Sequence, residues 1–316
     1  MDSDVIPRHG LGTAPLGGLF TEVSDHDAAD TVATAIERGI RYFDTAPQYG
    51  HGLAETRLGI AFERSGLHRN ELFVSTKVGR VLVPGADSTS IFHGTPPMRP
   101  QFDFSSDGVR RSLHDSLARL GLDYIDMALV HDPDDHETDA IDMAFPTLIR
   151  LRDEGLIGAI GVGMNQVEML TRFAQHASEI GLDAVLVAGR WSLLDRSAGV
   201  EGGLLDTCAQ HGVRVIVGGV FNSGLLANPQ LGATFDYRTA PPQLVRAAER
   251  MARVCSEFGV SLTTAALQFP WRHLAVSSVV VGARTAAEVE SNVAAQSGAP
   301  PEALWPALDA CVGELG

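Results

Sequence analysis

The sequence has few cysteines, an acidic N-terminus and no long apolar run, and each of these features disfavours a class of protein. Its three cysteines, Cys208, Cys255 and Cys311, are odd in number and far apart, which is typical of reduced thiols in the cytoplasm. No apolar run approaches the roughly 20 residues that cross a bilayer, and the first residues lack the apolar core of a secretory signal. We therefore expect a cytoplasmic protein without a membrane-spanning segment.

Basic residues are also scarce. Lys and Arg total 24 against 39 Asp and Glu, and the resulting net charge of −15 disfavours nucleic acid and anionic membranes as partners. Among these 24 basic residues Lys77 is the only lysine. Lysine carries a compact ammonium whose pKa can shift, whereas arginine carries a planar guanidinium. A single retained lysine therefore suggests a chemical role.

Apolar runs with β propensity alternate with amphipathic helical stretches along all 316 residues. The strands are predicted at Gly10–Ala14, Ile40–Asp44, Leu72–Lys77, Ile125–Val130, Ala159–Val162, Ala184–Val187, Val213–Val217 and Ser278–Val281. Helices are predicted at Asp27–Arg38, Leu53–Arg64, Ser106–Leu120, Ala140–Glu154, Gln166–Ile180, Gly203–His211, Leu244–Phe258, Thr263–His273 and Thr285–Ala295. Eight alternating units favour an α/β fold, a (β/α)8 TIM barrel forming one domain over residues 1–316. No G-x-G-x-x-G follows the first strand, which weakens a dinucleotide-binding doubly wound sheet.

Two long connections, Arg80–Asp103 and Phe221–Pro242, follow the ends of predicted strands and are rich in Gly, Pro and Ser. In a barrel, the loops after the strand C-termini build the active-site face. Loops of this length usually shape a pocket or a lid. We therefore expect both to border the active site.

Four side chains with complementary chemistry lie at or just beyond strand ends. Asp44, Lys77 and His131 end three strands, and Tyr49 follows Asp44 by five residues. Opposite charges at neighbouring strand ends favour a buried Asp44–Lys77 pair, because an unpaired buried charge is costly. An ammonium beside Tyr49 stabilises the phenolate, so the tyrosine can exchange a proton with a substrate oxygen that His131 orients. This set suits hydride transfer, since it needs no nucleophile.

The motifs around these residues resemble the aldo-keto reductase superfamily, in the family's order and over nearly the whole chain. They are Gly10–Gly18, Phe43–Glu55, Ser75–Lys77, Leu120–Asp126, His131 and Gly158–Asn165. The resemblance implies a (β/α)8 barrel with a catalytic tetrad, which falls on Asp44, Tyr49, Lys77 and His131.

The resemblance also implies a nicotinamide cofactor across the barrel mouth. Asn165 would hold the carboxamide and Trp191 would stack on the nicotinamide, whereas Ala188 replaces a glutamine that usually supplies a second carboxamide contact. The full set of implied contacts is Gly12, Thr13, Asp44, Asn165, Trp191, Phe221, Ser223, Gly224, Leu225, Gly282, Ala283, Arg284, Thr285, Glu288 and Asn292. Within it, residues 221–225 would bind the pyrophosphate through backbone N–H groups, residues 282–285 open a helix, and Asn292 matches an adenine contact.

Cofactor choice depends on two residues of opposite sign. Glu288 stands where NADP-preferring relatives often carry Arg or Gln, and its carboxylate would repel a 2′-phosphate but accept hydrogen bonds from a 2′-hydroxyl. Arg284 favours the phosphate instead. The balance favours NAD, with NADP possible.

Within the superfamily the motifs look like the branch of sugar 1-dehydrogenases acting on L-fucose, D-arabinose or L-galactose. The resemblance implies oxidation of the sugar at C1 to a lactone, with Tyr49 as general base and His51 and Trp191 as substrate contacts. Three alternatives stay open: pyridoxal 4-dehydrogenase, a general aldehyde or ketone reductase, and a redox-sensing module that acts through a partner protein. The expected partner is a small sugar or aldehyde, and the oligomeric state, including a homo-oligomer, is undetermined.

The cluster from His131 to His136 also permits a metal interpretation, because histidines and carboxylates at a barrel mouth bind metals in some hydrolases. The first strand offers no His-x-His to complete such a site. We therefore expect no metal, and interpret Asp132, Asp134, Asp135 and His136 as mostly solvated loop.

Overall fold

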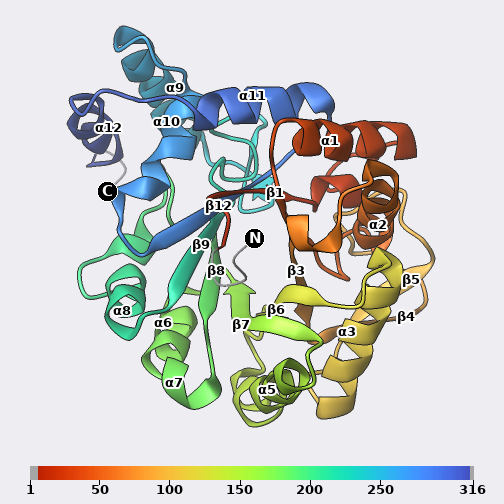
Figure 1. Ribbon diagram of the computed structural model, residues 1–316. Coiled ribbons are helices and arrows are strands. Elements are labelled where there is room, and N and C mark those ends of the chain that lie inside the picture. Colours follow the sequence, from red (N-terminus) through yellow and green to blue (C-terminus); the bar gives the residue numbers. More distant parts are fainter. Residues whose placement is uncertain (1–5, 314–316) are drawn as a thin grey trace.

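A computed structural model describes residues 6–313. Eight parallel strands close into a barrel in which each strand pairs with its neighbours in the chain and the last pairs with the first (Figure 1). The barrel strands are β1 His9–Gly12, β2 Tyr42–Asp44, β3 Phe73–Val78, β6 Ile125–His131, β7 Ile157–Met164, β8 Ala184–Ala188, β9 Arg214–Gly218 and β12 Val276–Gly282. The predicted (β/α)8 barrel is confirmed, and each of the eight predicted strands overlaps one of these.

The side chains of the barrel strands alternate between two apolar layers. Tyr42, Phe73, Met127 and Leu129 belong to a small cluster, whereas their chain neighbours, such as Phe43, belong to the large cluster packed against helices. Successive side chains of a strand point to opposite faces, so the small cluster fills the barrel and the large one lies between barrel and helices. This filled interior leaves the strand ends, not a central pore, as the place for a site.

Helices surround the barrel (Figure 1). The helices between or after barrel strands are α1 Asp25–Glu37, α2 Leu53–Ser65, α3 Ser106–Leu120, α5 Phe145–Asp153, α6 Val167–Gln175, α8 Leu204–His211, α10 Leu262–Gln268 and α11 Ala286–Gln296. Four of them begin after a hydroxyl N-cap that accepts a backbone N–H, namely Ser24, Ser105, Ser261 and Thr285. Such caps satisfy N–H groups that a helix start leaves free, which explains why these helices begin where they do.

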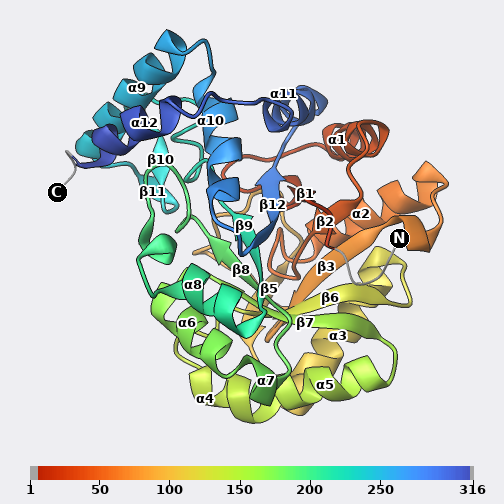
Figure 2. The same cartoon turned by 60° about the vertical axis from the view of Figure 1, so that its left-hand side comes forward.

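Two helices lie outside this ring. Helix α9, Pro242–Glu257, packs against α12, Leu304–Gly313, and Figure 2 shows the two side by side. Their apolar faces share a second core with α10, in which Met251, Leu304 and Leu308 are fully buried. The sequence interpretation included α9 but missed α12, a short helix whose apolar residues are interrupted by Pro306.

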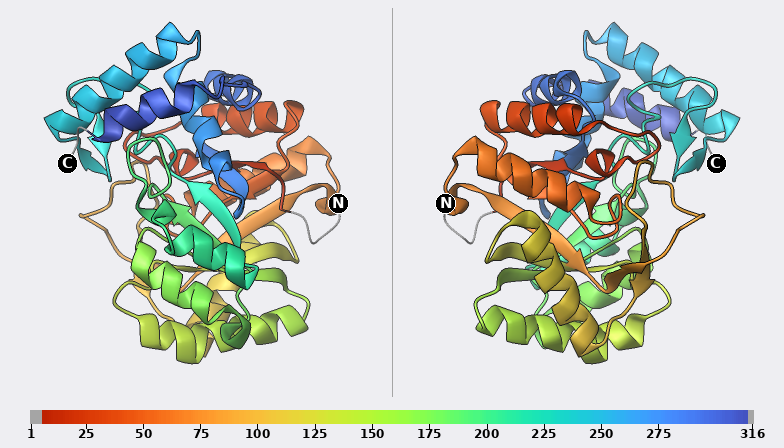
Figure 3. Two further views of the ribbon diagram at one scale, coloured as in Figure 1. Left: turned by 90° about the vertical axis from the view of Figure 1, so that its left-hand side faces the viewer. Right: turned by 90° about the vertical axis from the view of Figure 1, so that its right-hand side faces the viewer.

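The two long connections are more ordered than expected. The first contains an antiparallel hairpin of β4 Arg80–Pro84 and β5 Met98–Phe102, and the second a short hairpin of β10 Thr234–Phe235 and β11 Arg238–Thr239. Both lie on the same side of the barrel (Figure 3). Val81, Leu82 and Val83 give β4 its strand propensity, a signal obscured by the Gly, Pro and Ser around it.

Several predicted helices are divided. The stretch expected at 140–154 starts with a π-turn, Ala140–Ala144, and the one expected at 166–180 breaks at His176 into α6 and α7, Ala177–Ile180. The remaining short elements are α4 Glu137–Asp139 and the 3-10 turns Pro15–Gly17, Arg69–Glu71, Ser197–Gly199 and Phe269–Arg272. No helix within residues 6–313 is long and apolar enough to cross a membrane.

Candidate active site

The loop after β2 carries Tyr49 and rests on the loop after β1. The Tyr49 N–H donates to the carbonyl of Ala46 at 3.0 Å, which tightens the turn. A Cβ on Gly17 would lie 2.6 Å from the Tyr49 carbonyl carbon and from the Gly50 nitrogen. Only a glycine permits this approach, so Gly17 sets the height of Tyr49 above the barrel.

A buried ion pair lies beneath Tyr49. Register brings Asp44 of β2 beside Ser75 of β3, two residues before Lys77. Lys77 Nζ lies 2.8 Å from Asp44 Oδ2, and Ser75 Oγ donates to Asp44 Oδ1 at 2.6 Å. Lys77 also donates to the Thr45 carbonyl at 2.9 Å. Since both charged side chains are at most 5% exposed, these bonds are what make their burial tolerable.

The ammonium faces Tyr49. Lys77 Nζ lies 4.6 Å from the centre of the Tyr49 ring. Burial raises the pKa of Tyr49 to about 12, while the charge of Lys77 acts to lower it and that of Asp44 to raise it. Burial also works to lower the pKa of Lys77, but Asp44 and Tyr49 outweigh it and raise the net value. Lys77 is therefore a permanent cation, as the tuning role requires.

His131 completes the cluster from β6. Its ring meets that of Tyr49 edge to face, with centroids 6.1 Å apart. Burial lowers the pKa of His131 well below its ordinary value, and Arg80 and Lys77 lower it further. The imidazole is therefore neutral near pH 7, able to donate a hydrogen bond from one nitrogen only. Within residues 6–313 its Nδ1 has no hydrogen-bond partner.

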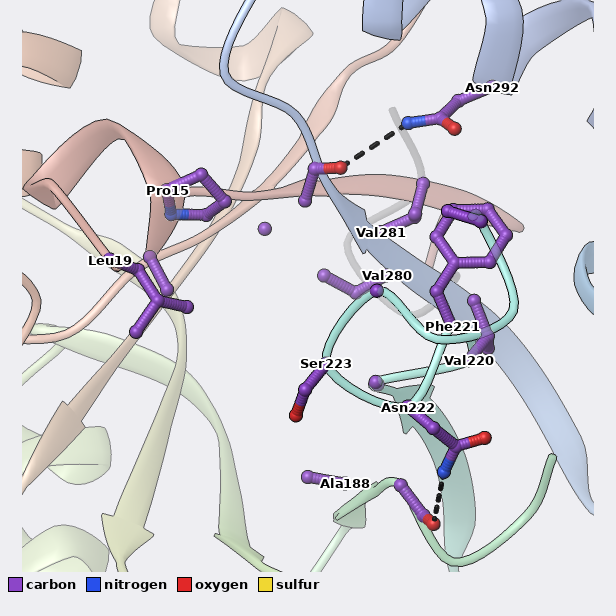
Figure 4. A pocket seen from close by; sticks show the side chains of 18 of the residues that line it. Pro15, Leu19, Ala188, Val220, Phe221, Asn222, Ser223, Val280, Val281 and Asn292 are labelled. Atoms are coloured by element: carbon purple, nitrogen blue, oxygen red, sulfur yellow. Dashed lines mark hydrogen bonds between the residues drawn. The ribbon is translucent and has the colours of Figure 1, made fainter. Parts of the chain in front are cut away.

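A cavity of about 460 Å³ opens above this cluster. It extends from Asp44 and Tyr49 past the loop after β9 to Glu288 and Asn292 of α11. Figure 4 shows Pro15 and Leu19 on one side of it, with Val220, Phe221 and Ser223 across from them. A cavity that extends from Asp44 and Tyr49 to α11 has room for an extended ligand.

The structure brings most of the implied cofactor contacts to this cavity. Those that line it are Gly12, Asp44, Asn165, Phe221, Ser223, Gly224, Gly282, Arg284, Glu288 and Asn292. Four of the others do not line it: Thr13 donates to the Asp44 carbonyl, Thr285 caps α11, and Leu225 and Ala283 are buried. These four support the cavity without facing it.

The loop after β9, for which the sequence predicts phosphate binding, has an unusual backbone. Asn222, Ser223 and Gly224 all have positive φ, at 46°, 56° and 101°. Asn222 is fixed by hydrogen bonds to Ser192 Oγ and to the Gly189 carbonyl, the latter drawn in Figure 4. No acceptor among residues 6–313 takes the N–H groups of Phe221 and Ser223. Free N–H groups in such a turn are suited to an anion.

At the far end of the cavity Arg284 and Glu288 form an ion pair. Arg284 Nη2 lies 2.7 Å from Glu288 Oε1, and the Arg284 N–H donates to Glu288 Oε2 at 2.8 Å. Asn292, one turn further, donates to the Gly282 carbonyl at 3.3 Å (Figure 4). The two residues that the sequence sets in opposition thus neutralise one another.

Two predicted contacts lie outside the cavity. The Trp191 indole packs on Phe269, with ring centroids 4.8 Å apart, and its N–H donates to the Pro270 carbonyl at 3.1 Å. The indole is directed into the second core and not toward the tetrad. In this position Trp191 does not offer its ring to a nicotinamide in the cavity. His51 is buried, 3.2 Å from Ser90 Oγ, and anchors the β4–β5 hairpin instead of facing a substrate.

Asp132 is not the solvated loop residue that the sequence suggests. It lies 2.8 Å from Arg80 Nη2 and 3.5 Å from His131 Nε2, with a strained φ of 42°. Burial raises its pKa, against the effect of Arg80. No group of three or more His, Cys, Asp or Glu in the described part of the chain could hold a metal.

Sequence reasoning missed several residues of the cavity. Phe20 and Tyr237 come from loops after β1 and β9 and meet with ring centroids 6.0 Å apart. Ser75 supports Asp44 from the middle of β3, and its signal was available: it stands two residues before Lys77, on the same face of the strand. Phe20 and Tyr237 carry no such signal, because only the loop conformation turns them inward.

The family model of the aldo/keto reductase family matches residues 9–312. The chain belongs to this family. It is 40% identical to D-threo-aldose 1-dehydrogenase from a Pseudomonas species, with 96% of this chain and 93% of that protein aligned. It is also similar to pyridoxal 4-dehydrogenase from Microbacterium luteolum, at 38% identity over 95% of this chain and 92% of that protein. L-galactose dehydrogenase from Arabidopsis thaliana is 31% identical, over 90% and 83%.

A solved structure agrees with this assignment. Glycerol dehydrogenase from Gluconobacter oxydans superposes with a TM-score of 0.75 at 25% identity, covering 99% of this chain and 96% of that one. This aldo-keto reductase is therefore an NAD(P)-dependent oxidoreductase.

Proposed function

We propose that this aldo-keto reductase is a cytoplasmic enzyme that oxidises an aldose at C1 to the lactone. The observation that carries the proposal is the buried Asp44–Lys77 pair beneath Tyr49, at the end of an elongated cavity. The similarity to D-threo-aldose 1-dehydrogenase and to L-galactose dehydrogenase supports an aldose as the substrate class. The three cysteines are buried as thiols, which is consistent with a reducing compartment.

Tyr49 acts as the general base in this proposal. Its phenolate takes the proton of the anomeric hydroxyl while C1 loses a hydride, so that the C1–O single bond becomes the lactone carbonyl. Lys77 stabilises the phenolate, and Asp44 keeps the ammonium in place. The neutral His131 donates a hydrogen bond to the same substrate oxygen and orients it.

A nicotinamide cofactor supplies the hydride acceptor. In the proposal Asn165 would hold its carboxamide, the free N–H groups of Phe221 and Ser223 its pyrophosphate, and Asn292 its adenine end. We favour NAD over NADP, because the Arg284 guanidinium is already paired with the Glu288 carboxylate. A 2′-phosphate would have to displace that carboxylate to bind Arg284. A ribose 2′-hydroxyl instead adds a donor to the exposed carboxylate.

Pyridoxal is the alternative substrate, on the strength of the similarity to pyridoxal 4-dehydrogenase. Its hemiacetal offers the same secondary alcohol to Tyr49, so the tetrad does not discriminate between the two. Discrimination between them falls to the cavity wall in this proposal, because a sugar presents hydroxyls where pyridoxal presents a flat aromatic ring.

The test is an initial-rate measurement of absorbance at 340 nm, with NAD and then NADP, against L-fucose, D-arabinose, L-galactose and pyridoxal. NAD reduction with a sugar supports the proposal, whereas turnover with pyridoxal alone refutes the aldose assignment. Turnover confined to aldehyde reduction with NADPH refutes both the substrate and the cofactor. The matched variant is Tyr49→Phe, which should lose activity by orders of magnitude and still bind cofactor in a fluorescence titration.

A further inference from the structure

The β10–β11 hairpin places a tyrosine where the backbone favours glycine. Thr234 pairs with Thr239 and Phe235 with Arg238, which leaves a loop of two residues, Asp236 and Tyr237. Their φ angles are 48° and 60°, as a tight two-residue hairpin loop requires. Asn and Gly are the usual residues at such positions, and a bulky side chain there stores strain. Strain of this kind is typical of functional positions.

Contacts on both sides fix this strained loop. The Tyr237 N–H donates to Ser223 Oγ at 3.1 Å, and Thr234 Oγ1 donates to the Ser223 carbonyl at 2.5 Å. Arg190 Nη1 lies 2.8 Å from Asp236 Oδ2, and its Nε donates to the Asn165 carbonyl at 3.2 Å. The hairpin is therefore tied to the loop after β9 and to Asn165, both of which line the cavity.

The Tyr237 side chain forms part of the cavity wall. It lines the cavity together with Tyr49, and its ring lies against Phe20, another non-glycine residue with positive φ, at 62°. Tyr237 is 50% exposed, and the described chain offers its hydroxyl no hydrogen-bond partner.

We propose that Tyr237 contacts the substrate and selects for hydroxylated compounds. Its hydroxyl bonds to a substrate hydroxyl away from the reacting carbon, while its ring and that of Phe20 cover the mouth. This inference rests on the proposed oxidation of an aldose. A free phenol at the edge of a mostly apolar chamber is suited to orient a polyol, because a bound ligand displaces water from the phenol and an unmatched polar group is then costly.

The test compares Tyr237→Phe with Tyr124→Phe, which removes the same atom beside the opposite end of β6. Tyr237→Phe should raise KM for the aldose by roughly 3- to 10-fold, the effect of one hydrogen bond, without changing the Kd for NAD. Tyr124→Phe should leave both unchanged. Deoxy analogues locate the contact: the analogue that lacks the bonded hydroxyl loses affinity for the wild type but not for Tyr237→Phe.

A second variant separates function from folding. Tyr237→Gly relieves the positive φ, so its melting temperature should equal or exceed that of the wild type, although KM rises at least as much as in Tyr237→Phe. An unchanged KM in both variants, for an aldose that the wild type oxidises, overturns the inference alone. An equal increase in KM for a small aldehyde without hydroxyls also overturns the inference alone. If the wild type oxidises no aldose, the proposed function fails, and this inference fails with it.

Discussion

Replacing Lys77 with methionine removes the charge beside Tyr49 and keeps most of the side-chain volume. The base must lose its proton to accept one from the substrate, so aldose oxidation depends on the pKa of Tyr49. Burial raises that pKa to about 12, and Lys77 acts against the increase. Without the ammonium the pKa rises further. At any pH below it, the fraction of phenolate then falls tenfold for each unit of increase.

The separation of the two groups gives the size of the effect. With 4.6 Å between Nζ and the ring centre, and an effective dielectric constant of about 20, the interaction is roughly 3.6 kcal/mol. That corresponds to about 2 to 3 pKa units, since one unit is about 1.4 kcal/mol. Lys77→Met should therefore lower kcat/KM for oxidation by about 100- to 1000-fold between pH 7 and 10.

The assay is NAD reduction at 340 nm over this pH range, together with cofactor affinity from fluorescence. In the wild type, kcat/KM should rise about tenfold per pH unit, because the phenolate fraction does so below a pKa of about 12. A folded Lys77→Met protein that binds NAD normally and keeps more than about a tenth of the activity would refute the electrostatic role. A flat wild-type profile would refute Tyr49 as the titrating base.

Two controls distinguish lost charge from lost structure. Lys77→Met leaves Asp44 buried and unpaired, which costs about 3 to 5 kcal/mol of stability, and adding Asp44→Asn should recover most of this cost without restoring wild-type activity. In Lys77→Ala, added methylammonium should partly restore turnover because it returns a cation to the vacated space. Rescue by an equal concentration of a neutral alcohol would instead indicate simple space filling.

Three further predictions concern the surroundings of the tetrad. Gly17→Ala should lower kcat at least about tenfold with little change in KM, because its Cβ would displace the Tyr49 backbone; unchanged kinetics would contradict this. Ser75→Ala should lower the free energy of unfolding in urea by about 1 to 3 kcal/mol, since Asp44 loses a buried hydrogen bond, and an unchanged value would show that another donor replaces it. Glu288→Ala frees the guanidinium it holds, so the Kd for NADP should fall about tenfold relative to NAD in a fluorescence titration; equal shifts for both nucleotides would argue against the pair as selector.

The barrel was predictable because its signals are local and repeated. Each strand is a short apolar run before an amphipathic helix, and eight such units leave few alternatives to closure. The hairpin at Arg80–Phe102 was not, because its β-branched residues lie among Gly, Pro and Ser that suggest a loop. Helix α12 was missed for a similar reason, since a proline interrupts its apolar pattern.

The site, like the fold, was predictable where the signal in the sequence is local and regular. Asp44, Lys77 and His131 end adjacent parallel strands, so their proximity follows from register, and the sequence alone was enough to predict it. Trp191 shows the limit of motif matching. Its position in the chain suggested a stacking role, but Phe269 and the Pro270 carbonyl hold the indole in a core that no local pattern reveals.

The two cavity aromatics that the sequence did not predict, Phe20 and Tyr237, both come from loops, and this has a consequence for substrate specificity. Asp44, Lys77 and His131 are fixed by strands and Tyr49 by the short loop after β2, and together they act on whatever alcohol reaches them. Phe20 and Tyr237 are instead held by strained backbone and by contacts such as that with Ser223, which together fix their inward direction. Differences between relatives that act on aldoses and those that act on pyridoxal should therefore lie in these loops, while the tetrad stays the same. Exchanging the segment 234–239 between such relatives should shift the ratio of kcat/KM values for sugar and pyridoxal, and leave the pH dependence of turnover unchanged.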